Sequence, residues 1–283
     1  VRNESVRFTN YHSTNLDSYT SLIAMLTSVQ VPYRAYSNPG RFEAVNDAPS
    51  LTAALREHGF QSLFVNPSNF LPFIPVRDMW DRIVTRGDLP KDANWVSVGK
   101  NAVESAVEDR AAISTIADFI KSYDRTLVMH EMKFGHSPQW IVRTGKQPAE
   151  YCAIYFRELI AALAEADLDE RTLFILTTDH GDRAEPADPR NYHVPLMLFG
   201  DGMKPAVDSR FLSHLDFQHV VGHYLSDLPL PESRDRLITV GSTESWTYGE
   251  ISAAGEYQFI DNAWGIVLAQ HGQLDPSTLH DRF

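Results

Sequence analysis

The chain has 283 residues and a mass of 32.0 kDa, which is enough for one large domain, or for one domain with a small appendage. Its formal charge of −12 and its lack of a basic tract argue against a protein that binds nucleic acid or an anionic membrane surface. A single cysteine, Cys152, excludes an internal disulfide framework, and no apolar run approaches the roughly 18 residues of a membrane-spanning helix.

Apolar residues recur along the chain with the alternating periods of helices and strands. In chain order, we expect helices at 18–27 and 50–58, strands at 62–65 and 95–98, a helix at 102–123, a strand at 126–130, a helix at 148–166, strands at 173–180 and 194–199, and a helix at 214–226. This alternation predicts the α/β class, with a mostly parallel central sheet flanked by helices. We expect residues 1–228 to form this domain.

The last part of the chain has a different pattern. Short apolar segments at 237–240, 245–251 and 257–260 are separated by Gly-containing turns, which is typical of antiparallel hairpins. We therefore expect residues 229–283 to form a small antiparallel, β-rich subdomain that packs on the same fold.

Ser18 is the first candidate for chemistry. Leu22 and Leu26 share a helical face, and Asn15 or Asp17 can cap the start of the helix, so Ser18 falls in its first turn. Free backbone N–H groups and the helix dipole favour an anion at that point. A serine hydroxyl there can lose its proton to a metal and attack a phosphorus or sulfur centre. The alternative is that Ser18 only caps the helix.

A loop with two histidines follows a strand in the middle of the chain. We expect His130 and His136 to lie at the same edge of the sheet as Asp179, where loop histidines can bind an anionic substrate or act as a general acid. The alternative is that both are ordinary surface histidines. We interpret Lys133 and Arg143 as solvated charges rather than as contacts of an anion.

Asp179 and His180 end the strand expected at 173–180, and Gly181 follows them. A carboxylate and an imidazole thus lie at the carboxyl end of a buried strand, where open α/β sheets bind their ligands. His193 introduces the next strand. One Asp and two His suit zinc or manganese better than calcium or magnesium, which prefer shells of oxygen. The alternative is a turn at the strand end without a metal.

Taken in order, these segments resemble the sulfatase-like branch of the alkaline phosphatase superfamily, and most of all its phosphoethanolamine and phosphoglycerol transferases. The matching segments are Phe8-Thr9-Asn10-Tyr11, Ser18-x-x-Ser21, 51–65, the His-x(5)-His-x-Pro segment 130–138, Thr178-Asp179-His180-Gly181, His193-Val194-Pro195 and 213–219. Their order and spacing extend the resemblance over nearly the whole chain.

Within that family, the residues around the nucleophile separate the activities. Sulfatases carry a formylglycine made in a Cys/Ser-x-Pro-x-Arg context, whereas Ser18 is followed by Tyr19-Thr20-Ser21-Leu22, without the Pro or the Arg. The resemblance therefore implies an unmodified Ser18 that attacks a phosphodiester, holds its head group covalently and passes it to a hydroxyl or to water. A sulfuric-ester or phosphomonoester hydrolase of the same fold is the alternative.

The resemblance also implies the other members of the site. One divalent metal, zinc or manganese, would be held by Asp179, His180 and Ser18, with His193 as a further ligand close to it. His130, His136 and His193 would bind the phosphoryl group, and His136 would protonate the leaving oxygen. The expected substrate is a phosphodiester or sulfate ester, on a lipid head group or a glycan, and the expected location is the periplasm or the cell surface.

The start of the chain departs from the family pattern. Family members open with a strand that carries an acidic metal ligand some tens of residues before the nucleophile. Here 17 residues precede Ser18, and Glu4 is too close to fill that place. We expect either that this strand, with any membrane anchor, lies outside the present sequence, or that the chain is a truncated and inactive family member.

Overall fold

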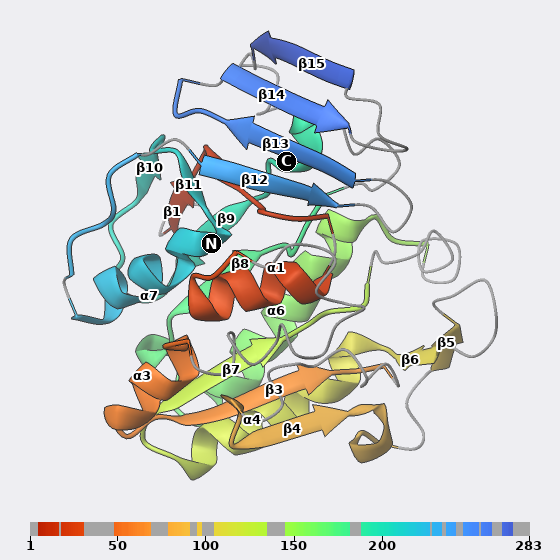
Figure 1. The fold of residues 1–283 in the computed structure, drawn as a ribbon. Helices are drawn as coiled ribbons and strands as arrows, with labels where there is room; N and C mark the ends of the chain where they lie inside the picture. The colour runs from red at the N-terminus through yellow and green to blue at the C-terminus, as the bar shows by residue number, and fades with distance from the viewer. Residues whose placement is uncertain are drawn as a thin grey trace. The chain divides into compact units, whose positions relative to one another are not determined.

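The computed structural model describes residues 5–16, 18–30, 48–68, 79–90, 95–97, 105–134, 145–181, 188–226, 228–233, 236–241, 246–254, 256–261 and 268–273. The chain divides into two compact units, Val1–Leu51 with Leu173–Phe283, and Thr52–Thr172. Both combine sheets with helices (Figure 1), so the predicted α/β class is confirmed, while the boundary predicted after residue 228 stays a prediction. No helix in the described ranges is long and apolar enough to cross a membrane.

The first unit is built on a mixed sheet with the strand order β10-β1-β9-β8. Its strands are β1 (Ser5–Phe8), β8 (Phe174–Thr177), β9 (Leu196–Phe199) and β10 (Ala206–Asp208). β10 runs parallel to β1, but β9 is antiparallel to both β1 and β8. This sheet is less parallel than predicted because the described part of the β8–β9 connection holds the 3-10 turn η7 (Pro189–Asn191) and no crossover helix.

Helices and aromatic side chains pack this unit together. Phe174 and Phe199 stack with their ring centroids 5.0 Å apart. α1 (Ser18–Thr27) contacts the 3-10 turn η8 (His214–Asp216) and α7 (Phe217–Ser226). The predicted helices at 18–27 and 214–226 are therefore confirmed, the second one beginning as a 3-10 turn.

Two smaller groups of strands complete the first unit. β2 (Tyr11–His12) pairs in parallel with β11 (Leu212–Ser213). The C-terminal strands, drawn in blue in Figure 1, form an antiparallel meander of β12 (Arg236–Gly241), β13 (Trp246–Ile251), β14 (Glu256–Asp261) and β15 (Leu268–Gln273). The predicted antiparallel C-terminal region is confirmed, with β15 as an additional strand.

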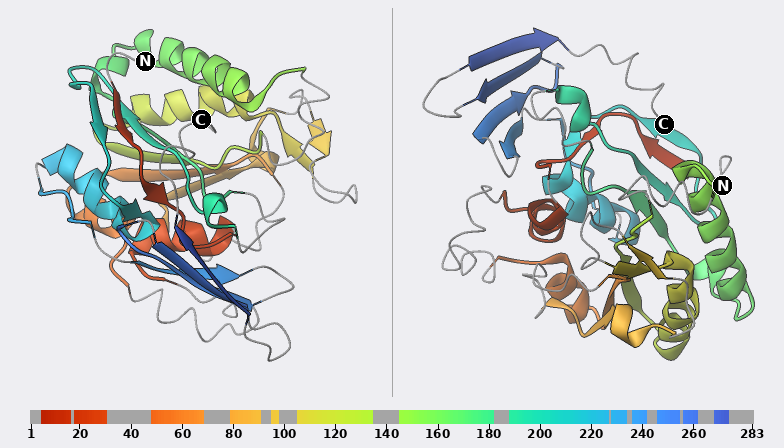
Figure 2. Two further views of the ribbon diagram at one scale, coloured as in Figure 1. Left: turned by 90° about the horizontal axis from the view of Figure 1, so that it is seen from above. Right: turned by 90° about the vertical axis from the view of Figure 1, so that its right-hand side faces the viewer.

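The second unit contains a parallel sheet. β3 (Gln61–Asn66) lies between β4 (Arg82–Thr85) and β7 (Thr126–His130). α4 (Ile113–Ser122) and α6 (Pro148–Ala164) pack side by side in this unit (Figure 2). The remaining elements are α3 (Leu51–Glu57), η4 (Arg86–Asp88), β5 (Trp95–Ser97), β6 (Ser105–Val107), η5 (Asp109–Ala112) and η6 (Asp169–Arg171).

The helix predicted at 102–123 is wrong in its first half. Residues 105–107 form β6, which pairs antiparallel with β5, and helical structure begins only at Asp109. Apolar residues there fit a short strand as well as a helical period. Asp109 is buried by contacts with the backbone of Lys133 and Phe134, which are distant in sequence and therefore invisible to a local pattern.

Candidate active site

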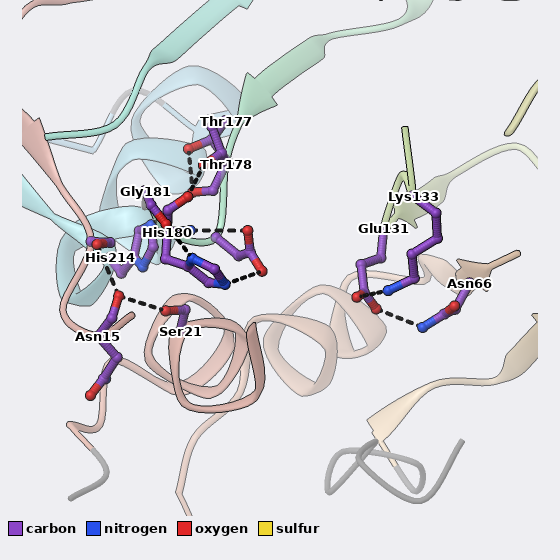
Figure 3. A network of polar contacts seen from close by, with 12 residues as sticks. Asn15, Ser21, Asn66, Glu131, Lys133, Thr177, Thr178, His180, Gly181 and His214 are labelled. Atoms are coloured by element: carbon purple, nitrogen blue, oxygen red, sulfur yellow. Dashed lines mark hydrogen bonds and ion pairs between the residues drawn. The ribbon is translucent and has the colours of Figure 1, made fainter. Parts of the chain in front are cut away.

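The strand predicted at 173–180 is shorter than expected, because β8 ends at Thr177 and Asp179 and His180 lie in the loop that follows it. His180 is labelled in Figure 3. His180 Nδ1 is 2.7 Å from the carbonyl oxygen of Gly181, and His180 Nε2 is 3.6 Å from Asp179 Oδ2. Because a carbonyl oxygen only accepts, Nδ1 donates to Gly181, and Nε2 is the ring nitrogen that faces the carboxylate. The backbone N–H of His180 donates to Asp179 Oδ1 at 3.0 Å and fixes that side chain.

This pair fits a divalent cation held between the two side chains. An imidazole whose other nitrogen donates to a backbone carbonyl is the usual state of a histidine metal ligand, and zinc and manganese both accept nitrogen with oxygen. The side chains of Asp179 and His180 are 30% and 15% exposed, so an ion can reach them. Within the described ranges, no three His, Cys, Asp or Glu side chains gather closely enough to hold a metal. Further metal ligands would therefore be groups of another kind, such as a serine hydroxyl, or residues outside the described ranges.

Gly181 is required by the packing of the same loop. Its backbone N–H donates to the carbonyl oxygen of Asn191 at 3.1 Å. A Cβ atom at position 181 would lie 2.3 Å from that oxygen, so any side chain would push the loop away from η7. The glycine thus keeps the Asp179–His180 pair against a fixed part of the backbone.

His214 is a residue of this region that the sequence analysis did not assign. Its side chain is fully buried, and its Nε2 lies 3.2 Å from the carbonyl oxygen of Thr178, the residue before Asp179. Burial lowers the pKa of His214 to about 4, against the opposing charge of Asp179, so the ring is neutral and donates from Nε2. The Ser213-x-x-Asp216 capping box predicts the turn that carries His214, but nothing local in the sequence shows its contact with Thr178.

Ser18 is the first residue of α1 and is partly exposed. Backbone N–H groups in the first turn of a helix have no acceptor within the helix, which suits an anion. The preceding turn is fixed by the carbonyl oxygen of Asn15, which accepts from the hydroxyls of Ser13 at 3.0 Å and Ser21 at 3.4 Å. The Asn15 side-chain oxygen has no hydrogen-bond partner in the described part of the chain, so Asn15 does not cap α1, and Asp17 lies outside that part.

His193 belongs to the framework beside this site. It forms an antiparallel bridge with His12, and its Nε2 lies 3.0 Å from the carbonyl oxygen of Thr9. The fully buried His12 meets the His193 ring edge-on at 5.4 Å, and burial, followed by the charge of His193, lowers the pKa of His12 well below its usual value. Both predicted roles of His193, in metal binding and in substrate binding, stay predictions.

In the second unit, a polar network joins the carboxyl ends of β3 and β7 (Figure 3). Glu131 Oε2 accepts from Asn66 Nδ2 at 2.7 Å, and Glu131 Oε1 pairs with the ammonium group of Lys133. The Lys133 side chain is only 12% exposed, so its interpretation as a solvated charge was wrong. Arg143 lies outside the described residues.

His130 is the last residue of β7 rather than a loop residue, and it is buried among polar groups. Its Nδ1 is 2.6 Å from the Tyr155 hydroxyl, and its Nε2 is 3.6 Å from Asp109 Oδ1. Burial, and then the charge of Lys133, lowers the pKa of His130 to about 3, so the ring is neutral at pH 7. Its role in substrate binding stays a prediction. His136, predicted to bind substrate and to act as the acid, lies outside the described residues.

Comparison with known sequences identifies a matching family. Residues 155–226 match the family model described as Sulfatase. Arylsulfatase K of Gallus gallus is 26% identical over 152 residues, which cover 44% of this chain and 28% of that protein. The match therefore spans less than a third of the length of this relative.

Solved structures share the fold over most of the chain. A protein of the alkaline phosphatase superfamily from Vibrio parahaemolyticus has a TM-score of 0.71 at 15% identity, over 98% of this chain and 76% of that chain. The lipoteichoic acid synthase LtaP from Listeria monocytogenes has a TM-score of 0.61 at 14% identity, over 99% and 80%. The C-terminal periplasmic domain of EcEptC from Escherichia coli, in complex with Zn, has a TM-score of 0.51 at 12% identity, over 84% and 79%.

These similarities show that the chain shares its fold with a protein of the alkaline phosphatase superfamily. The resemblance to its sulfatase-like branch is confirmed. The similar proteins include a sulfatase and a lipoteichoic acid synthase, so similarity alone does not distinguish between the two reactions. The reaction has to be inferred from the residues of the site.

Proposed function

We propose that this chain is the catalytic part of a metal-dependent phosphotransferase or phosphodiesterase of the sulfatase-like family, with a covalent intermediate on Ser18. The observation that supports it best is the Asp179–His180 pair, in which the imidazole Nε2 faces the carboxylate at 3.6 Å. Ser18, at the start of α1, belongs to the same compact unit as this pair. An unmodified hydroxyl and a carboxylate–imidazole pair are the groups that this chemistry requires.

In the proposed reaction, Ser18 Oγ attacks the phosphorus of a phosphodiester, and the P–O bond to the leaving alcohol breaks. An acceptor hydroxyl or water then attacks the same phosphorus and releases Ser18. A zinc or manganese ion held by Asp179 and His180 would supply a Lewis acid that favours the ionised hydroxyl of Ser18. Backbone N–H groups at the start of α1 stabilise the negative phosphoryl oxygens.

His193 lies in the same unit as Ser18, and in the proposed reaction it contacts the phosphoryl group. The predicted roles of His136 as the acid, and of His130 and His136 in substrate binding, stay predictions. We place the phosphodiester on a lipid head group or a glycan. We also propose a periplasmic or cell-surface location, supported by the similarity to the periplasmic domain of EcEptC.

Hydrolysis of a sulfuric ester is the second candidate function. The Sulfatase match over residues 155–226 and the identity to arylsulfatase K favour it. The residues after Ser18 argue against it, because the Pro and Arg that accompany formylglycine formation are absent from this segment.

Turnover of model substrates tests the proposal. With zinc or manganese present, the wild type should hydrolyse bis(p-nitrophenyl) phosphate faster than p-nitrophenyl sulfate. Ser18→Ala and Asp179→Asn should each lower kcat by at least about 10³-fold, because each removes a group that acts on the reacting atoms. The exposed residues Ser209 and Asp201 offer matched controls, Ser209→Ala and Asp201→Asn, which should keep full activity.

Two results would go against the proposal. Wild-type rates in both Ser18→Ala and Asp179→Asn would contradict the assigned roles. Faster turnover of the sulfate ester than of the phosphodiester would favour the second candidate.

A further inference from the structure

A buried histidine of the first unit, His12 of β2, has no part in the proposed reaction. Its side chain is fully buried, and its ring centroid is 4.8 Å from that of Phe211 and 5.4 Å from that of His193. Its Nε2 is 2.9 Å from the side-chain oxygen of Asn10. The Asn10 amide nitrogen donates to the carbonyl oxygen of Ser209 at 3.5 Å, so the Asn10 oxygen accepts and His12 Nε2 donates.

A histidine is a costly choice for this position. His12 Nδ1 is buried without a hydrogen-bond partner in the described part of the chain. An unpaired polar atom in such surroundings destabilises the folded state, and a phenylalanine would fill the same place without that cost. The hydrogen bond to Asn10, which holds the ring in one orientation, is what the histidine adds.

The segment that carries His12 also fixes the backbone of His193. The two residues form an antiparallel bridge, which backbone hydrogen bonds of 2.7 Å and 3.0 Å flank on either side. Opposite side chains in such a pair lie close together, which explains the edge-on contact of the two imidazoles. The freedom that remains to His193 is rotation of its side chain. The Thr9 carbonyl oxygen, 3.0 Å from Nε2, and the His12 ring restrict this rotation.

This bridge is connected to the loop that follows β8. The carbonyl oxygen of Asn191, two residues before His193, accepts the backbone N–H of Gly181 at 3.1 Å. All of these residues belong to the first unit, as Ser18 does. The orientation of the His193 imidazole is therefore set within the unit that carries the proposed nucleophile.

We propose that His12 is a positioning residue whose ring, held by Asn10, fixes the orientation of the His193 imidazole for contact with the phosphoryl group. The inference rests on the proposed function and deepens it, because it assigns the residue that directs His193 toward the substrate anion. An imidazole that is already restricted to one orientation loses less conformational entropy when it contacts an anion, so the substrate binds more tightly.

Three substitutions separate the two contacts of His12. His12→Leu removes both the planar ring and the donor, His12→Phe keeps a planar ring, and His12→Gln keeps a donor for Asn10. With bis(p-nitrophenyl) phosphate and zinc in excess, we expect His12→Leu to raise KM about tenfold while kcat changes by less than about threefold. His12→Phe should bring KM back to within about threefold of the wild type, whereas His12→Gln should behave like His12→Leu, because the ring is what contacts His193. The exposed His219 supplies the matched control, His219→Leu, which should change neither value.

A double-mutant cycle tests whether His12 acts through His193. In a His193→Ala background, His12→Leu should change KM by less than about twofold, because the group that it positions is already absent. The same tenfold rise in both backgrounds would overturn the positioning role.

The His193 ring reports the role without any need for turnover. Carbon-13 relaxation of labelled histidine should show a rigid His193 ring in the wild type and a mobile one, with an order parameter below about 0.6, in His12→Leu. If His12→Leu does not fold, the half-buried Asn10 offers a milder variant, Asn10→Ala, which removes the acceptor of His12 Nε2. Asn10→Ala should also increase the mobility of the His193 ring, and it should raise KM about threefold.

The outcomes separate this inference from the proposed function. A rigid His193 ring in the folded variants would overturn the positioning role, and so would rescue by His12→Gln but not by His12→Phe. A mobile ring with unchanged KM would overturn the link to substrate, even where Ser18→Ala abolishes turnover. No turnover by the wild type would overturn the proposed function and that link together, while the relaxation data would still show whether His12 orients His193.

Discussion

At the scale of the residue, the orientation of Asp179 and His180 depends on their neighbours. The Gly181 carbonyl sets the tautomer of His180, and Gly181 itself keeps the loop against Asn191. His214 does not contact the pair but supports the residue before it, because its Nε2 donates to the carbonyl oxygen of Thr178. Partners that orient a ligand from behind commonly change metal affinity when they are replaced.

We therefore expect His214→Phe to weaken zinc binding by about 10- to 100-fold, since the Thr178 carbonyl loses its donor and the Asp179–His180 loop loses its support. Competition with a chromogenic chelator at constant pH measures the affinity without any need for activity. The exposed His219 provides the control, His219→Phe, which should bind zinc like the wild type. Equal affinities in a folded His214→Phe variant would contradict this supporting role.

At the scale of the element, packing of α6 and η5 against the end of β7 determines the charge state of His130. Tyr155 comes from α6 and Asp109 from η5, and they meet the two nitrogens of the His130 ring. Burial thereby keeps the ring neutral in the folded protein. In the unfolded chain, His130 regains the ordinary histidine pKa of about 6.5.

This difference makes part of the stability depend on pH. Because the pKa of His130 is lowered to about 3 on folding, its contribution is complete above about pH 6.5 and is lost as the pH falls toward 3. The loss is at most about 1.4 kcal/mol per pH unit. Asp109 acts in the opposite direction, since its pKa is raised to about 7 and its contribution is lost as the pH rises from about 4 to 7.

His130→Gln should therefore gain stability relative to the wild type as the pH is lowered from 7 to 5. Denaturant unfolding at the two pH values measures this, and the difference between variant and wild type isolates His130 from Asp109. The exposed His58 supplies the control, His58→Gln, which should follow the wild type. A constant difference between His130→Gln and the wild type at both pH values would contradict the effect of burial.

At the scale of the whole molecule, the chemical groups lie where strands end. Asp179 follows β8, and Glu131 follows β7, as expected for an α/β fold. These positions could be predicted because an apolar run that ends in polar residues is visible in the sequence. Helix boundaries could also be predicted where a local residue determines them. Pro148 is the first residue of α6, and Gly59, whose φ is +81°, follows the end of α3.

Features that depend on distant contacts could not be predicted in this way. His214 and Thr178 are 36 residues apart, and Asp109 and Lys133 are 24 apart, so no local pattern reports either hydrogen bond. The antiparallel pairing of β8 with β9 likewise depends on which strands become neighbours. The strand at 105–107 was mistaken for helix because pairing with β5 decided its conformation.

The central claim is that Ser18 forms a covalent bond to phosphorus. The most direct measurement is mass spectrometry of the wild type and of Ser18→Ala, each quenched during turnover of a phosphodiester with zinc or manganese present. We expect the added mass of the phosphoryl group on the peptide that contains Ser18, and none in Ser18→Ala. Turnover without an adduct on Ser18, or with an adduct on another residue, would contradict the claim.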